Sequence, residues 1–477
     1  MAQAPATRDG VRWGALSGPL WRARDWVDDV ARRSPARLAL LVFAAIIAVV
    51  TALLSLPVAT ASGQRAPFAD ALFTAVSAVC VTGLVTVDTA TYWSGFGQVV
   101  ILVGIKIGGL GVMTLASILG LAVSRRIGLT QKMLAATETK TTRLGEVGTL
   151  IRAVVVASLV IEAVLTLILF PRFLTIGESI GSALWHGFFM SLSIFNNAGF
   201  VVLPDGLTPF VGDWWFCLPL IVGTAVGAIG FPVILDISRS VRNRRYGQRA
   251  VWRRWSLHTK LSLVTYAALA AATAVAIAVM EWTNPDTFGP LAVHERILAS
   301  LVQSVNPRSS GLATIDVGEM REASWFVTDA LMFVGGGSAS TAGGIKVSTF
   351  AVLVLAIVAE ARGDRDIEAF GRRIGSTTVR LAVSVAFLGA TLVGVGALLL
   401  LAVTDFHLDV VLFEVISAFA TVGLSTGITP ELPDSGKYIL SALMFAGRTG
   451  TMTMAAALAL RQRRRVIRMP NERPVIG

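Results

Sequence analysis

Long apolar runs separated by polar connections dominate the pattern of the chain. Four of them, at 38–56, 149–170, 260–280 and 379–403, have the length of roughly 20 residues that a helix needs to cross a bilayer. A polar connection, a short apolar segment and a glycine-containing turn follow each run. Each turn leads into a second long apolar segment, at 95–123, 213–236, 323–360 and 436–460. This pattern predicts an all-α polytopic membrane protein.

The four turns resemble one another in sequence. They read SAVCVTGLVTVD (77–88), SLSIFNNAGFVVLPD (191–205), SLVQSVNPRSSGLATID (300–316) and EVISAFATVGLSTG (414–427). Each contains a glycine followed by Leu or Phe, and Gly83, Gly199, Gly311 and Gly423 lie at nearly equal intervals. Repetition at a fixed period indicates a repeated structural unit. We therefore predict four repeats of span, pore half-helix and span (M1-P-M2) around one pseudo-fourfold pore, with eight transmembrane helices.

Non-helical backbone at membrane depth survives only where it is buried in protein or lines a water-filled cavity. A glycine tolerates positive φ, so its carbonyl can face a shared axis, and a ring of carbonyls can replace the hydration shell of a monovalent cation. The half-helices add the partial negative charge of their C-terminal ends. One such turn alone is typical of a helix–helix connector, whereas four at matching positions favour a selectivity filter. The candidate ion-binding residues are Val81, Thr82, Gly83, Asn197, Ala198, Gly199, Ser309, Ser310, Gly311, Thr421, Val422 and Gly423.

Composition and charge agree with a membrane protein. Apolar residue types make up 54% of the 477 residues and charged types 15%, with a formal net charge of +11. Most of the 41 Lys and Arg residues cluster at 1–37, 124–148, 237–260, 361–380 and 461–477. Because basic loops stay on the cytoplasmic side, we expect both termini to be cytoplasmic and the number of spans to be even. This placement also argues against a nucleic-acid partner.

The chain divides accordingly into alternating pore repeats and basic connections. The predicted parts are a cytoplasmic N-terminal extension (1–37), pore repeat 1 (38–123), a cytoplasmic loop (124–148), pore repeat 2 (149–236), a basic cytoplasmic loop (237–257), pore repeat 3 (258–360), a cytoplasmic loop (361–378), pore repeat 4 (379–460) and a basic C-terminal tail (461–477). The polar extension, with its three tryptophans, is predicted to lie amphipathically on the inner leaflet among the lipid headgroups.

A catalytic function has little support in the sequence. Cys80 and Cys217 are too few for a disulfide framework or a metal site, and the four histidines show no ligand spacing. A membrane-embedded enzyme would need a polar catalytic set within the spans, but the polar residues found there repeat with the turns. A structural scaffold would have no use for four re-entrant turns. We therefore predict that the protein is not an enzyme.

The second apolar segment of repeat 3 is interrupted by small residues. Its stretch GGGSASTAGG comprises Gly335, Gly336, Gly337, Ser338, Ala339, Ser340, Thr341, Ala342, Gly343 and Gly344. Such a sequence is a poor helix former, and a broken helix at membrane depth should line a cavity. We predict that it is a gate loop below the filter, with close small-residue helix packing as the alternative. The matching segments 104–115, 223–235 and 445–454 have fewer glycines and are expected to remain helical.

Several charged residues fall inside or beside the apolar segments, where they are costly and usually face the interior. Arg448 is predicted to point at the cavity beneath the filter, as an electrostatic barrier or a latch on the loop, or else to form a structural pair with a carboxylate or with loop carbonyls. Lys106 and Lys346 are expected to snorkel or to bind carbonyl groups. Glu162 is expected to be an interhelical hydrogen-bond partner.

Three aspartates and one arginine lie close to the turns in sequence. Asp88, Asp205 and Asp316 follow their turns and would concentrate cations at the outer mouth, unless they are simply solvated loop charges. Arg308, beside the third turn, is expected to pair with a carboxylate of that mouth such as Asp316.

The motifs AVSAVCVTGLVTVD, FNNAGF, RSSGL and AFATVGLSTGITPEL, in this order, resemble the four filter segments of the Trk/Ktr/HKT potassium transporter superfamily. The likeness extends to FVGGGSASTAGGIKVSTF (333–350) and to the ending PNERPVIG, and is strongest to the KtrB-type membrane subunits of bacterial Ktr systems. It covers the chain from about residue 35 onward. Ser309-Ser310, in place of the more usual Thr-Ala, and Cys80 depart from the family pattern.

The resemblance implies potassium (K+) as the transported ion, since a glycine in all four filters resembles the potassium-selective members. It also implies passive flux, a homodimer of two pores, and a cytoplasmic nucleotide-binding (RCK/KtrA-like) regulatory ring in a bacterial plasma membrane. Sodium (Na+) acts as an activator in some members, and no organic cofactor is expected in this chain. A Trk-type subunit with another regulatory partner, or a less selective Na+/K+ pathway, are the alternatives.

Overall fold

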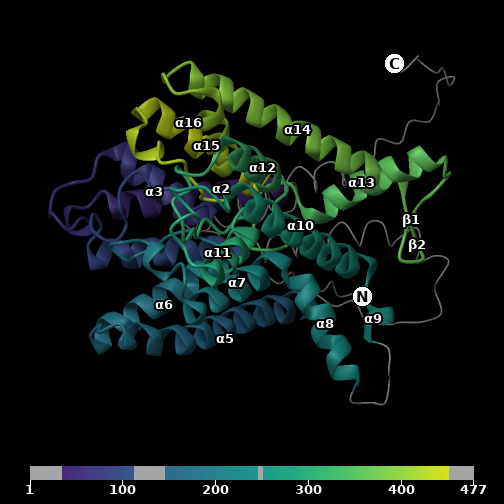
Figure 1. Ribbon diagram of the computed structural model, residues 1–477, viewed down its shortest axis with the longest axis horizontal. Helices are drawn as coiled ribbons and strands as arrows, with labels where there is room; N and C mark the ends of the chain where they lie inside the picture. Colours follow the sequence, from purple (N-terminus) through teal and green to yellow (C-terminus); the bar gives the residue numbers. More distant parts are fainter. Residues whose placement is uncertain (1–34, 112–144, 245–250, 451–477) are drawn as a thin grey trace, which may run out of the picture.

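The computed structural model describes residues 35–111, 145–244 and 251–450, and within them the chain is mostly helical (Figure 1). The N-terminal extension, most of the predicted loop 124–148, the ends of the segments 95–123 and 436–460, and the C-terminal tail lie outside the described residues.

The four long apolar runs form the four first helices, α2 (Pro35–Leu54), α5 (Gly145–Thr175), α10 (Leu257–Glu281) and α14 (Ser376–Leu401). A short helix follows each of them: α3 (Phe68–Cys80), α6 (Ile180–Asn196), α11 (Val293–Val305) and α15 (Leu408–Ala420). The next helices along the chain are Gly95–Gly111, α7 (Trp214–Ile229) with α8 (Phe231–Arg244), α12 (Glu322–Phe333) with α13 (Val347–Arg362), and α16 (Asp434–Phe445).

The remaining elements are short. They are the 3₁₀ turns η1 (Pro57–Ala59), η2 (Thr208–Phe210) and η3 (Thr429–Glu431), the π-helical turn η4 (Ala446–Gly450), and α9 (Val251–Arg254). Strands β1 (Ile367–Ala369) and β2 (Arg372–Ile374) pair antiparallel as a hairpin between α13 and α14, with Glu368 opposite Arg373. Its two-residue turn, Phe370-Gly371, has positive φ at both positions, as tight hairpins prefer.

The short helices form the centre of the molecule and are packed in the same way. Each contacts the long helix that precedes it, in the pairs α2–α3, α5–α6, α10–α11 and α14–α15. Three of them also contact a second helix of another unit, in the pairs α16–α3, α7–α11 and α12–α15. Almost every residue of α3 is buried, and α15 is buried from Phe413 to its end at Ala420. The C-terminal halves of the central helices, which lead into the turns, are the most deeply buried parts of these helices.

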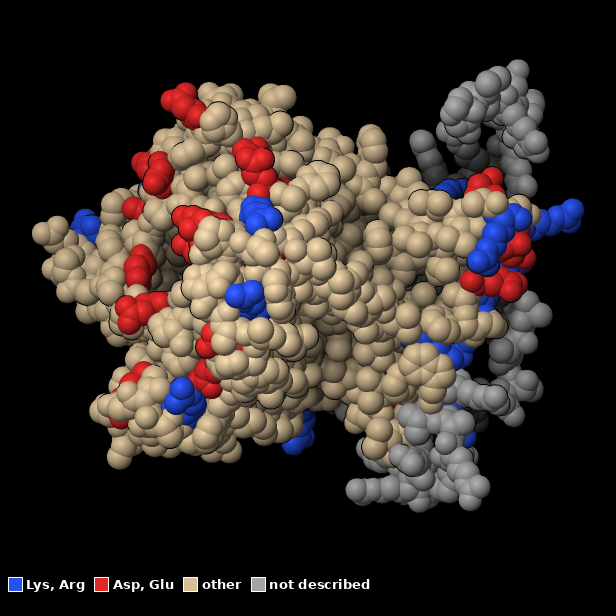
Figure 2. All heavy atoms as spheres, viewed as in Figure 1, with Lys and Arg blue, Asp and Glu red and all other residues tan. Residues whose placement is uncertain are grey.

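The outer surface is apolar, as expected for a protein whose solvent is lipid. Large apolar side chains on the long helices point outward, with Val279 and Phe387 each 75% exposed and Leu167 71%. Three described helices, Arg152–Thr175, Leu257–Glu281 and Ser376–Leu401, are long and apolar enough to cross a membrane, or four if the bent pair α7–α8 is one span. In Figure 2, a band almost free of charged side chains separates a mainly acidic end from the end that bears the β1–β2 hairpin and many Lys and Arg side chains. The protein is an integral membrane protein.

One predicted helix is wrong. The segment 213–236 is not a continuous span, because α7 ends at Ile229 and α8 starts at Phe231 with a bend of 98° between them. The break lies at Gly230, whose φ is +98°. A Cβ built at Gly230 would lie 2.6 Å from the Ser338 carbonyl oxygen, so only glycine lets the two backbones approach this closely. The second unit therefore has a helix break that contacts the loop of the third unit. A helix break had been predicted for the third unit alone.

Candidate functional site

The four turns share an unusual backbone conformation two residues before each glycine. Val81, Asn197, Ser309 and Thr421 each lie two residues before a turn glycine, and their φ angles are 57°, 57°, 75° and 49°. Non-glycine residues rarely occupy this left-handed region. In three of the turns, the residue that follows the left-handed one donates its amide hydrogen to the carbonyl five residues before it. Thr82 donates to the Ser77 carbonyl and Val422 to the Ser417 carbonyl, both at 2.8 Å. This is the hydrogen-bond pattern of a helix that stops and reverses.

The turn glycines meet one another in chain order. A Cβ built at Gly83 would lie 2.6 Å from Gly199 Cα, and one at Gly423 would lie 3.0 Å from Gly83 Cα. One at Gly199 would lie 3.3 Å from the Ser310 carbonyl oxygen, and one at Gly311 would lie 3.1 Å from Gly423 Cα. All four glycines have positive φ, between 65° and 95°. The sequence-predicted turns thus form a closed ring of backbone in which no side chain at the glycine positions would fit.

Buried side chains hold all four turns through their backbone groups. Gly83 donates its amide hydrogen to Ser77 Oγ at 3.0 Å, and Gly423 donates to Ser417 Oγ at 3.1 Å. In the second turn, the Ser193 hydroxyl donates to the Phe200 carbonyl at 2.7 Å. In the third, where the matching position is a valine, the amide of Asn306 donates to the Leu312 carbonyl at 3.1 Å. These buried contacts fix the orientation of the peptide groups next to the glycines.

The glycine-rich loop lies directly against the ring. It is non-helical from Val334 to Lys346, and its residues are buried except for the partly exposed Ser338, Ala339 and Lys346. The Gly343 amide donates to Ser309 Oγ at 3.2 Å, and the Ser309 hydroxyl in turn donates to the Thr421 carbonyl. With its amide placed so that both of its polar atoms are satisfied, Asn197 accepts a hydrogen bond from Thr341 Oγ1 at 3.1 Å. A Cβ built at Gly343 would overlap Thr421 Oγ1, so the loop also lies against the fourth turn and touches the left-handed residues of three turns.

Backbone contacts tie the loop to the broken helix pair α7–α8. The Gly337 amide donates to the Ala228 carbonyl at 2.7 Å, and the Phe231 amide donates to the Ala339 carbonyl at 3.2 Å. Within the loop, Gly335 donates to Ile345 at 2.8 Å. The bend at Gly230 lies where the α7–α8 break and the loop exchange hydrogen bonds. These hydrogen bonds satisfy backbone groups at the helix ends that have no partner within their own helix.

Two cationic side chains bind the carbonyls of this loop. Arg448, in the π-helical turn η4, is 2% exposed and donates from Nη1 to the Thr341 carbonyl. Lys346 Nζ donates to the Ala342 carbonyl at 2.6 Å and to the Gly343 carbonyl at 3.2 Å. The expectation of carbonyl binding is confirmed for Lys346. For Arg448, the contact is with a loop carbonyl rather than with a carboxylate.

The expected pairing of Arg308 with Asp316 is wrong. Arg308 is fully buried, donates from Nη2 to Thr273 Oγ1 at 3.1 Å, and lies with its guanidinium 5.0 Å from the centre of the Tyr266 ring. Asp316 is exposed and accepts from the Gly318 amide at 2.9 Å. Arg308 points back toward α10, so packing against the aromatic face replaces the ion pair. Asp88 and Asp205 are also exposed on the connections that follow their turns.

Sequence reasoning missed two features of this region. Lys106 was expected to snorkel or bind carbonyls, but its Nζ lies 2.5 Å from Glu162 Oε2 in an ion pair. Ser309 was predicted only as a filter residue that departs from the family pattern, yet its hydroxyl joins the loop to the fourth turn. For the Lys106–Glu162 pair, the only signal in the sequence was the presence of opposite charges in two neighbouring apolar segments. Nothing in the sequence indicated the hydrogen bonds of Ser309.

The comparisons with known proteins agree with this architecture. The family model for TrkH, a cation transport protein, matches residues 16–465. The chain is 39% identical to the Ktr system potassium uptake protein B of Bacillus subtilis (strain 168), over 91% of this chain and 95% of that protein. It is 34% identical to the Ktr system potassium uptake protein B of Vibrio alginolyticus, over 94% of this chain and 96% of that protein.

A further relative and a solved structure extend the comparison. The potassium/sodium uptake protein NtpJ of Enterococcus hirae is 33% identical over 91% of this chain and 94% of its own length. The crystal structure of the potassium transporter TrkH from Vibrio parahaemolyticus has the same fold, with a TM-score of 0.70 over 88% of this chain and 84% of that one, at 16% identity. The predicted resemblance is confirmed: the chain is a membrane transport protein rather than an enzyme, and it belongs to the TrkH family of cation transport proteins.

Proposed function

We propose that the protein is the potassium-selective, cation-translocating membrane subunit of a Ktr-type potassium uptake system. The observation that carries this proposal is the closed ring of Gly83, Gly199, Gly311 and Gly423, each of which meets the next turn around the ring. The names of the relatives, which are uptake proteins for potassium or for potassium and sodium, support the choice of ion.

The ring is the proposed selectivity filter. Its ligands are the backbone carbonyls of the twelve residues that end at the four glycines, because oxygen dipoles can replace the water around a dehydrated K+ ion. The left-handed residue two positions before each glycine reverses the chain, so that successive carbonyls can face one axis. The C-terminal ends of α3, α6, α11 and α15 add partial negative charge there, which favours a cation over an anion.

The loop 335–344 is the proposed gate. It lies against three of the filter turns, and both Arg448 and Lys346 hold it by its carbonyls. In this arrangement the loop and the Arg448 charge oppose cation passage together, so Arg448 acts as a latch and as an electrostatic barrier. Flux then requires the loop to leave its contacts with Ser309 and Asn197.

The proposed topology is four M1-P-M2 repeats with eight spans and the domain boundaries given above. The separation of acidic and basic ends in Figure 2, together with the rule that basic loops stay inside, supports cytoplasmic termini in a bacterial plasma membrane. Asp88, Asp205 and Asp316 then lie on the outer side and attract cations to the mouth.

The proposed subunit works with partners. Homodimerisation and docking of a nucleotide-binding ring on the basic cytoplasmic face are what membership of a multi-subunit Ktr system would require, and the word system in the relatives' names supports additional subunits. Ion flux is passive in this account. Na+ is proposed as an activator rather than as the main permeant ion, with a less selective Na+/K+ pathway as the second candidate, favoured by the relative that is named for both ions.

The experiment is K+ uptake into liposomes that contain the purified protein, with Na+ or choline added as competitor. The proposal predicts uptake driven by the K+ gradient alone, little affected by equal Na+ and absent from empty liposomes. Uptake of both ions at equal rates would support the less selective pathway. Absence of uptake of either cation by folded protein, with and without a co-purified partner, would overturn the proposal.

A further inference from the structure

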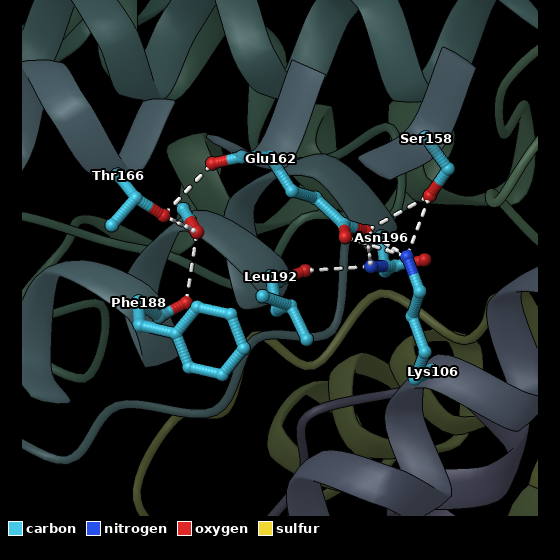
Figure 3. A network of polar contacts seen from close by, with 8 residues as sticks. Lys106, Ser158, Glu162, Thr166, Phe188, Leu192 and Asn196 are labelled. Atoms are coloured by element: carbon cyan, nitrogen blue, oxygen red, sulfur yellow. Dashed lines mark hydrogen bonds and ion pairs between the residues drawn. The ribbon is translucent and has the colours of Figure 1, made fainter. Parts of the chain in front are cut away.

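A partly buried ion pair lies next to the end of α6, where the second turn begins. Lys106 belongs to the helix Gly95–Gly111, and Glu162 belongs to α5 (Figure 3). Lys106 Nζ lies 2.5 and 2.6 Å from the two Glu162 carboxylate oxygens and 2.8 Å from Ser158 Oγ, and Ser158 donates to Glu162 Oε1 at 2.9 Å. The pair therefore joins the second helix of the first unit to the first helix of the second.

The same carboxylate also holds the end of α6. Asn196 donates from Nδ2 to Glu162 Oε1 at 3.0 Å and to the Leu192 carbonyl at 2.9 Å. Asn196 is the last residue of α6, and the next residue, Asn197, is the left-handed residue of the second turn. Glu162 is 3% exposed and Asn196 fully buried, so this contact is shielded from solvent. One hydrogen bond thus separates the ion pair from the backbone of the ring.

The packing around Asn196 is equally close. A Cβ built at Gly109, one turn along the helix from Lys106, would overlap Asn196 Oδ1. The position three residues before the turn glycine is held differently in the third unit, where Arg308 contacts Thr273 and Tyr266 of its own α10. It is a small residue in the first and fourth units, Cys80 and Ala420. Among the described residues, the second turn is therefore the one braced by an ion pair from two neighbouring helices.

We propose that Lys106 and Glu162 are positioning residues for ion discrimination, and that they act through Asn196 on the second filter turn. The pair binds no permeant ion, because both charges are already matched and lie next to the end of α6. It sets where α6 ends and hence how the Asn197–Gly199 carbonyls face the ring. The size of the ring, and with it the preference for K+ over the smaller Na+, then depends on this brace. The inference rests on the proposed function.

The test compares variants of the brace with a matched control in the purified, full-length protein. Asn196→Ala removes the link without leaving a charge unpaired, and Glu162→Gln weakens it from the other side. Thr166→Val is the control, because Thr166 Oγ1 makes a 2.7 Å hydrogen bond with Ser191 Oγ between the same two helices, α5 and α6, and contacts Glu162 only at its backbone carbonyl, at 2.8 Å (Figure 3). The readout is the ratio of K+ to Na+ uptake in liposomes, at equal amounts of folded protein.

We expect Asn196→Ala and Glu162→Gln each to lower the K+/Na+ ratio by about tenfold, the effect of losing one hydrogen bond to a charged group. Thr166→Val should leave the ratio unchanged. Because the pair acts through Asn196, combining Asn196→Ala with Glu162→Gln should lower the K+/Na+ ratio no further than Asn196→Ala alone. Where Glu162→Gln yields too little folded protein, Lys106→Met combined with Glu162→Gln removes both charges and should lower the ratio in the same way.

Two outcomes would overturn the inference. One is an unchanged K+/Na+ ratio in folded Asn196→Ala. The other is a variant with both Asn196→Ala and Glu162→Gln whose ratio falls by the product of the two single-variant factors. Either result with a potassium-selective wild type leaves the proposed function intact. A wild type without K+ preference would instead contradict the proposed function, so the two failures are distinguishable.

Discussion

The hydroxyl of Ser309 donates a hydrogen bond to the backbone carbonyl of Thr421, and through it the third and fourth turns are joined at the point where the glycine-rich loop arrives. The same oxygen accepts from the Gly343 amide at 3.2 Å. A single buried hydroxyl thus links two turns of the proposed filter to the proposed gate. Removing this hydroxyl should therefore weaken the contact between the loop and the turns.

Ser309→Ala should make the loop easier to displace. We expect basal K+ uptake in liposomes to rise about fivefold, which corresponds to a lost hydrogen bond worth about 1 kcal/mol. Ser309→Thr keeps a hydroxyl and should behave as wild type. Thr51→Val is the matched control, because its buried hydroxyl donates to the Ile47 carbonyl at 2.8 Å within α2 and touches neither the loop nor a turn. Equal uptake by all four proteins would contradict a gating role for this contact.

Arg448→Gln should open the same gate from the other side. The substitution removes both the charge and the hydrogen bond that the guanidinium donates to the Thr341 carbonyl. We expect K+ uptake to rise about tenfold, as for the loss of a charged hydrogen bond. Arg448→Lys keeps the positive charge but loses the guanidinium geometry. If Arg448 acts mainly as an electrostatic barrier, K+ uptake by this variant should stay at the wild-type level. If it acts mainly as a latch on the Thr341 carbonyl, uptake should rise as in Arg448→Gln. Lower uptake by well-folded Arg448→Gln would show that Arg448 is needed for the open state instead.

Gly230→Ala should alter gating without altering selectivity. An alanine there is strained at φ +98° and its Cβ meets the Ser338 carbonyl, so the loop must shift. We expect uptake of K+ and Na+ to change by the same factor, about fivefold or more for a strain of 1–2 kcal/mol, while their ratio stays constant. The two uptake rates measured in parallel decide this. A changed ratio would mean that the loop is part of the filter itself.

Asp213→Ala should reduce stability and leave transport ratios alone. Asp213 caps α7 by accepting from the amides of Trp215 and Phe216 at 2.9 and 3.3 Å, and it pairs with Arg172 Nε at 2.5 Å. Loss of such a cap costs about 1–2 kcal/mol, which thermal unfolding of the detergent-solubilised protein would register as a lower midpoint. Asp213→Asn keeps a capping oxygen and should lose less. If both variants unfolded like wild type, the cap would not contribute as stated.

The sequence was sufficient for the features that recur along it. The period of Gly83, Gly199, Gly311 and Gly423 led to four turns that meet, and the glycine content of 335–344 led to an interruption between α12 and α13. These are local properties: a left-handed turn needs its glycine nearby, and a glycine run cannot sustain a helix whatever surrounds it.

Features that depend on ring closure could not be predicted in this way. The partner of Lys106 lies on a different unit, and Arg308 turns toward Tyr266 rather than toward a carboxylate nearer in sequence. The bend at Gly230 arises because the loop of the next unit supplies hydrogen bonds to it. In each case a neighbour decides the conformation, and a periodic pattern does not say which neighbour that is.

The central claim is that the four turns form an ion filter, and Gly83→Ser tests it most directly. The control is Gly177→Ser, because Gly177 has the same φ of +95° but open space around it, so it carries the same backbone strain away from the ring. The measurement is K+ against Na+ uptake into liposomes for both variants and wild type. The account predicts that Gly83→Ser loses the preference for K+ while Gly177→Ser keeps it. An unchanged preference in folded Gly83→Ser would contradict the account, since a Cβ at that position could not then be entering a filter.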